Sequence, residues 1–208
     1  MRRIERRKFL RLAASVPLFL AAIPARAETG DASAMAPIER LNEALLSVMK
    51  VGEQTDFTRR FSMLAPAADG AFDFGAILRA SVGPRWMTLA QTDRARLLAS
   101  FRRYTISTYV ASFDHWTGQS LRTSPNPRSL PDGRAIVQTF IVPRSGDPTE
   151  LSYVMRQDAT GWRAMDVLAA GSISRVAVQR SDFTHLLSDG GASALMASLD
   201  RKVADLSG

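Results

Sequence analysis

Asp114 and His115 are the two residues whose types and spacing most readily suggest chemistry. A histidine beside a carboxylate can titrate near neutral pH and act as a general acid or base. The periodicity predicts that a long helix continues to about Trp116, and adjacent side chains on a helix point about 100° apart. The pattern therefore favours a histidine at a helix end on a solvated or interfacial face, and acid–base catalysis stays the alternative.

Other candidates for chemistry are few. The chain has two histidines and no cysteine, which excludes disulfides, thiolate metal sites, cysteine nucleophiles and a three-histidine zinc site. Ser172 and Ser174 lie in the run Ala-Gly-Ser-Ile-Ser, which lacks the G-x-S-x-G nucleophile elbow. His185 lies near a predicted helix C-terminus, where a positive charge is favourable for structural reasons. We predict no catalytic residue, no metal site and no cofactor.

The net charge of +7 is concentrated at the N-terminus. Residues 1–27 hold seven basic side chains and one acidic side chain, whereas the remaining 181 residues hold 20 basic and 19 acidic ones. A nearly neutral main part gives little support to nucleic-acid binding through phosphate contacts.

Residues 1–27 have the pattern of an export signal that is cleaved after Ala27. A basic segment precedes an apolar stretch from Leu12 to Ala25, followed by the small-x-small site Ala25-Arg26-Ala27. The apolar stretch is shorter than the roughly 20 residues that a spanning helix needs. Arg6-Arg7-Lys8-Phe9-Leu10-Arg11 is similar to a twin-arginine motif. The sequence thus predicts twin-arginine export to the bacterial periplasm, a flexible mature N-terminus over 28–36 and a single domain over 37–208.

Helical periodicity, then alternating periodicity, then helical periodicity again predict an α+β domain with an antiparallel sheet. Turn residues at Arg144–Pro148 and Asp158–Gly161 predict two hairpins. We expect helices from Pro37 to about Gly52, over Phe57–Ala67, from Asp73 to Val82, at Trp86–Leu89, from Thr92 to about Trp116, from Val176 to Asp189, and around Leu195–Leu206. We expect strands over Ser120–Thr123, Ala135–Pro143, Leu151–Gln157, Trp162–Ala169 and Ser172–Arg175.

Ordered landmarks from Pro37 to Lys202 resemble a known family. They are Ala71-Phe72-Asp73-Phe74, Val82-Gly83-Pro84-Arg85-Trp86, the long helix with Phe101, Tyr104 and Tyr109, Gly161-Trp162-Arg163-Ala164-Met165-Asp166-Val167, Gly171-Ser172-Ile173-Ser174, and Arg180-Ser181-Asp182-Phe183. Their order and spacing are similar to the periplasmic lipid carriers of the MlaC/toluene-tolerance type. Segments 79–86 and 109–114 look more like the hopanoid-associated HpnM branch. Gln179 departs from the tyrosine usual in the family.

The resemblance implies an NTF2-like fold, in which a curved antiparallel sheet and helices surround a deep apolar cavity. It implies a soluble periplasmic carrier that holds acyl chains of a phospholipid or hopanoid-type lipid between the inner and outer membranes. Its partners would be an inner-membrane ABC-type transport complex and an outer-membrane lipid complex, with transient membrane contact. The expected lipid-binding residues are the apolar positions Ile77, Phe101, Tyr104, Phe140, Val142, Tyr153, Met155, Met165, Val167 and Ile173.

Two rival hypotheses remain open. An NTF2-like isomerase or hydrolase would use Asp114 and His115 in the same cavity, and it requires ionisable side chains that converge there. A pure interaction module would have a filled core and no void behind the long helix. The side of the strand Ala135–Pro143 that faces a cavity is ambiguous, because both sides are apolar.

Overall fold

The computed structural model describes residues 28–208, with side chains from Ser33 onward. The predicted signal peptide, its twin-arginine motif and its cleavage site therefore lie outside the described residues. Within the described part, no helix is both long enough and apolar enough to span a bilayer.

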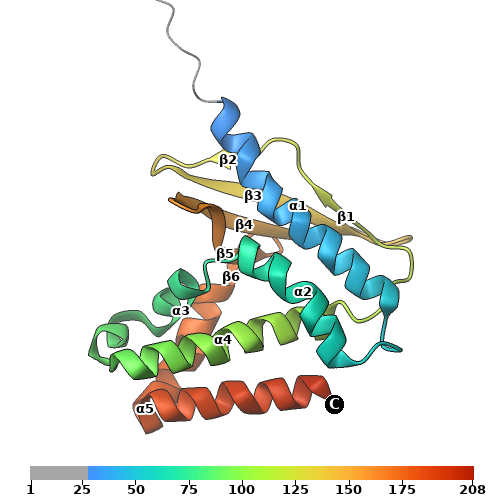
Figure 1. The fold of residues 1–208 in the computed structure, drawn as a ribbon. Coiled ribbons are helices and arrows are strands. Elements are labelled where there is room, and N and C mark those ends of the chain that lie inside the picture. The colour runs from blue at the N-terminus through green and yellow to red at the C-terminus, as the bar shows by residue number, and fades with distance from the viewer. Residues whose placement is uncertain (1–27) are drawn as a thin grey trace, which may run out of the picture.

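Over residues 28–208 the structure combines five α-helices and one short 3-10 helix with an open antiparallel sheet, in agreement with the predicted α+β class (Figure 1). The strands follow the order β1-β3-β4-β5-β6, and β2 pairs with β3. The elements are α1 (Glu28–Val51), α2 (Phe57–Ala71), α3 (Phe74–Val82), η1 (Gly83–Thr88), α4 (Gln91–Ser112), β1 (Ser120–Thr123), β2 (Arg128–Ser129), β3 (Arg134–Val142), β4 (Thr149–Asp158), β5 (Gly161–Ala169), β6 (Ile173–Ser174) and α5 (Arg175–Ser207).

Both predicted hairpins are confirmed, because β3 pairs with β4 and β4 pairs with β5 in antiparallel register. The helix ends were predicted less well. Helix α1 begins at Glu28, before the expected start at Pro37, so residues 28–36 are helical and Ala34 is fully buried. Helix α2 continues past Pro66 to Ala71, because packing of its buried side outweighs the local cost of the proline.

The helices surround the inner face of the sheet and bury it. Helix α1 crosses that face, and α4 and the second half of α5 lie side by side away from the sheet (Figure 1). An ion pair of 3.0 Å between Arg103 and Asp200 joins these two helices. Helix α5 turns sharply at Gly190 and Gly191, which have non-helical backbone angles, so the two helices predicted here are separated by a kink.

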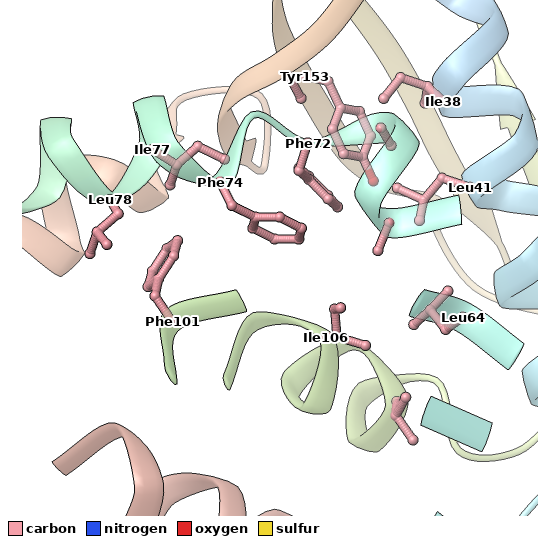
Figure 2. Close-up of a cluster of buried hydrophobic side chains, with 14 of the residues drawn as sticks. Ile38, Leu41, Leu64, Phe72, Phe74, Ile77, Leu78, Phe101, Ile106 and Tyr153 are labelled. Carbon is pink, nitrogen blue, oxygen red and sulfur yellow. The ribbon is translucent and has the colours of Figure 1, made fainter. Parts of the chain in front are cut away.

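A chain of aromatic rings fills the centre between the sheet and the helices. Phe72, between α2 and α3, lies 6.2 Å from the ring of Tyr153 and 5.6 Å from that of Phe74. Phe74 and Phe183 both make edge contacts with Phe101 on α4. Figure 2 shows Phe72 and Phe74 pointing into the space between β4 and α4. The aromatic residues of the sequence landmarks therefore build the core that holds α4 against the sheet.

Asp73 begins helix α3, as predicted. Its carboxylate accepts a hydrogen bond of 2.8 Å from the Ala76 backbone N–H, which satisfies one of the free donors at a helix N-terminus. Its other oxygen accepts a bond of 3.0 Å from Arg156 on β4. The cap thereby fixes the start of α3 relative to the sheet.

Candidate functional site

Two adjoining hollows lie between α4 and the inner face of the sheet. The first has a volume of about 70 Å³ and is lined by residues of α3, α4, β5 and the start of α5. The second has a volume of about 420 Å³ and lies between the C-terminal end of α4, the end of α1 and strands β3 to β5. Thr108, Tyr109, Val167 and Arg175 line both hollows, so the two meet at these residues.

The walls of the second hollow are mainly apolar. Phe113 and Met49 close one side, and the sheet contributes Ile141, Leu151 and Ala169. Ile141 shares the inner face of β3 with the buried Val137, because side chains alternate along a strand. The apolar part of the wall can take an apolar group, while Thr108, Gln119 and Arg175 are among the polar residues that also line the hollow.

Four of the ten predicted lipid-binding residues line the first hollow. They are Ile77, Phe101, Tyr104 and Val167, and Val167 also lines the second. They come together because α3, α4 and β5 meet behind the aromatic chain. Contact with lipid at these residues stays a prediction.

The other six lie elsewhere. Tyr153 and Met155 point to the inner face of the sheet but are at most 1% exposed and line neither hollow. Phe140 and Val142 alternate with Ile141, which places them on the opposite face of β3. Met165 lies where the pairing of β4 with β5 shifts, and Ile173 is 56% exposed.

Several lining residues were not predicted. Among them are Met49, Thr108, Ile141, Leu151 and Arg175. Thr105 and Thr108 could have been predicted as neighbours in the site, because their three-residue spacing puts them on one side of α4. Ile141 is apolar, but both sides of its strand are apolar, so the sequence could not show which side faces the hollow.

A carboxylate on β5 holds the start of α5 next to both hollows. Asp166 accepts hydrogen bonds from Ser174 Oγ at 2.5 Å and from the backbone N–H groups of Val167 at 2.8 Å and Val176 at 3.1 Å. Ser174 in turn accepts from the N–H of Ala177 at 3.0 Å and caps the helix. These bonds fix Arg175, the first residue of α5, at the junction.

Gln179 and Arg180 tie α5 to α3. Gln179 lines the first hollow and accepts a hydrogen bond of 3.0 Å from Ser81, which is fully buried. Arg180 donates two hydrogen bonds to the carbonyl of Ala80, at 2.9 and 2.6 Å. Arg180 of the Arg-Ser-x-Phe landmark therefore has a structural role in holding α5 against α3.

Tyr109, which lines both hollows, interacts through its hydroxyl group with Tyr153, which lines neither. Burial raises the pKa of Tyr109 to about 12, against the smaller opposing effects of the Tyr153 hydrogen bond and the Arg175 charge. Burial also raises the pKa of Tyr153 well above its usual value, with further contributions from Tyr109. Both phenols therefore stay neutral over the whole physiological range.

Asp114 and His115 contact each other, contrary to the geometry expected for neighbours on a helix. Helix α4 ends at Ser112 and Phe113 has non-helical angles, so the two side chains can turn together, with Asp114 Oδ1 2.5 Å from His115 Nδ1. Partial burial raises the pKa of Asp114, but the hydrogen bond and charge of His115, with help from Glu53, outweigh it and lower the pKa overall. The pair lines the rim of the second hollow, and the His115 side chain is 66% exposed.

A family model described as "MlaC protein" matches residues 39–201, well over half of the chain. The chain belongs to the MlaC family. The resemblance seen in the sequence is thereby confirmed at the level of the MlaC family, and assignment to the HpnM branch stays a prediction. No curated protein shows a significant match.

A solved structure similar to this MlaC-family chain is the phospholipid-binding protein from Ralstonia solanacearum, determined in complex with a phospholipid. The two chains are 20% identical, and the match has a TM-score of 0.72. It covers 85% of this chain and all of the other. At this identity the likeness shows that the two proteins share a fold.

Proposed function

We propose that this MlaC-family protein is a periplasmic lipid carrier, and not an enzyme, that holds the acyl part of a phospholipid or hopanoid-type lipid between the inner and outer membranes. The observation that carries the proposal is the pair of adjoining, mainly apolar hollows between α4 and the sheet. Family membership supports it, and so does a similar fold in a protein from Ralstonia solanacearum that binds a phospholipid.

The free energy of burying hydrocarbon explains why a carrier needs such a hollow. A chain of about 16 carbons gains roughly 13 kcal/mol on leaving water, at about 0.8 kcal/mol per methylene group. A dry cavity of about 150 Å³ binds one benzene molecule. On that scale the second hollow, of about 420 Å³, holds one acyl chain.

A diacyl lipid needs more room than this structure has. The first hollow, at about 70 Å³, is too small for a second chain. Movement of Phe101 and Ile77, which form its walls, would widen the first hollow, so that together with the adjoining second hollow it forms the deep NTF2-like cavity that the sequence resemblance implies. We propose this widening as part of lipid loading.

The remaining parts of the carrier cycle follow from the same hypothesis. Export through the twin-arginine leader would place the mature chain in the periplasm, where the family functions. An inner-membrane ABC-type complex and an outer-membrane complex would exchange lipid with it. Trp116 next to the rim is 43% exposed, and tryptophan prefers membrane interfaces, which supports transient membrane contact.

Native mass spectrometry of the mature protein, purified from a host with both membranes, tests the proposal. We expect a co-purifying lipid mass. Thr108→Phe places a ring where the hollows meet and should reduce the adduct at least about tenfold. Ala99→Phe adds the same ring on the exposed side of α4 and should leave the adduct unchanged. A wild-type protein without adduct after incubation with membranes contradicts the carrier function.

One observation favours the enzyme alternative, an isomerase or hydrolase with Asp114 and His115 in the hollow. Asp114 contacts His115 at the rim, and a side-chain hydrogen bond with Glu53 helps to lower the pKa of Asp114. The strong exposure of His115 weighs against it, because catalytic acids and bases usually lie in a desolvated cleft. An His115→Ala protein that carries the wild-type amount of lipid would exclude a need for this residue in lipid binding.

A further inference from the structure

Arg175 lies at the junction of the two hollows and has no acidic partner among the described side chains. It is exposed and lines both hollows. Among the side chains that the structure describes, residues 33–208, no hydrogen bond or ion pair involves its guanidinium group. As the first residue of α5, it lies at the positive end of the helix dipole, where a cation is unfavourable.

The carboxylates that share these hollows already have partners. Asp166 accepts three hydrogen bonds, from Ser174 and from the backbone N–H groups of Val167 and Val176. Asp114 contacts His115. Arg175 is therefore available to an anion that comes from outside the protein.

From this position we infer that Arg175 binds the phosphate group of a lipid and makes the protein select phosphate-bearing lipids over uncharged lipids of the hopanoid type. The inference rests on the proposed carrier function and adds the class of lipid. Arg175 lines the second hollow and its side chain is exposed, so it can reach the polar end of a lipid whose acyl chain lies in that hollow. The planar guanidinium can donate two parallel hydrogen bonds to phosphate oxygens.

The local structure positions Arg175 for this contact. The Asp166 bonds to Ser174 and Val176 hold the backbone on both sides of Arg175. Asp114 at the rim is the carboxylate of the second hollow that would repel a phosphate, and its side chain is held against His115. A hopanoid-type lipid has no phosphate for Arg175 to bind, so this residue would add nothing to the affinity for such a lipid.

The test compares three lipids with the same acyl chains: phosphatidylglycerol, phosphatidylcholine and diacylglycerol. Their binding to the mature protein is measured by displacement of a fluorescent fatty acid. We expect Arg175→Gln to weaken both phosphate-bearing lipids at least about tenfold and to leave diacylglycerol unchanged. Arg175→Lys keeps the positive charge but not the two parallel N–H donors of the guanidinium, so its loss of affinity for the phosphate-bearing lipids should be smaller than that of Arg175→Gln.

Arg201→Gln is the matched control, because Arg201 is also exposed on α5 and lines neither hollow. It should bind all three lipids as the wild type does. Unchanged phospholipid binding by Arg175→Gln overturns the inference and leaves the carrier function intact. An equal loss of all three lipids, in a variant with wild-type thermal stability, also overturns the phosphate assignment. A wild-type protein that binds none of the three contradicts the proposed function itself.

Discussion

Asp166 on β5 and Ser174 at the start of α5 are joined by a hydrogen bond of 2.5 Å, with Ser174 Oγ as the donor. The same carboxylate accepts from the N–H of Val176. One side chain of the sheet therefore anchors the N-terminus of the helix that closes the first hollow. The position of Arg175 depends on this anchor, so the pair connects the stability of the fold to the site.

Asp166→Ala should lower the free energy of unfolding by about 1–3 kcal/mol, because it removes an acceptor from three donors in a partly buried place. Urea unfolding followed by circular dichroism measures the loss. Asp205→Ala is the control for the change in charge, because Asp205 is exposed near the end of α5. An Asp166→Ala protein as stable as the control would show that the anchor contributes little.

Tyr109 and Tyr153 should make the protein less stable at high pH. An unfolded tyrosine has a pKa of about 10, whereas burial raises the pKa of Tyr109 in the fold to about 12 and raises the pKa of Tyr153 well above its usual value. Above pH 10 the unfolded chain loses these protons first, so the folded state binds more protons and its stability falls as pH rises toward 12. Below pH 10 this contribution is fully present.

Absorbance of the tyrosinate band during alkaline titration tests this directly. The chain has three tyrosines, and two of them should stay protonated at pH 10 to 11 until the protein unfolds. Tyr109→Phe should reduce the delayed part of the signal by half. Ionisation of all three tyrosines near pH 10 in the folded protein would contradict the assignment.

Gly191→Ala should destabilise the protein by about 1–3 kcal/mol. Gly191 has φ 64° and ψ −155° at the kink of α5, a region that essentially only glycine adopts. A Cβ there meets no atom within 4 Å, so the cost comes from the backbone and not from a clash. Thermal unfolding measures it.

Gly70→Ala is the matched control for that prediction. Gly70 lies in helix α2 with open space around the position of a Cβ. Alanine should stabilise the protein there by about 0.4–1 kcal/mol, because it restricts the unfolded chain. If Gly191→Ala lowers the free energy of unfolding and Gly70→Ala raises it, the loss at Gly191 comes from backbone strain and not from alanine in general. Changes of the same sign in both variants would contradict a strained backbone at the kink.

Local patterns predicted the elements well where the signal was short-range. The hairpins between β3, β4 and β5 followed from alternating apolar residues and turn residues, and Asp73 was correctly expected as a helix cap. The end of α4 was predicted too late, at Trp116 instead of Ser112, because the apolar spacing continues past the last helical residue. That error also hid the contact between Asp114 and His115.

The candidate site depended on relationships that no local pattern contains. Phe140 and Ile141 are adjacent and both apolar, so periodicity could not tell which of them faces the helices. The sequence predicted Arg175 only as the end of a strand over Ser172–Arg175, whereas in the structure it begins α5 and lies at the junction of the hollows.

The sequence by itself determined the order of helices and strands and the membership in the MlaC family, because turns, caps and periodicity act over a few residues and the landmarks keep their spacing. The tertiary structure alone decided which side of β3 lines the hollow, how much space remains behind the aromatic chain, and that Arg175 has no acidic partner in the part of the chain whose side chains are described. These properties arise from packing between residues distant in the chain, such as Thr108 on α4 and Val167 on β5.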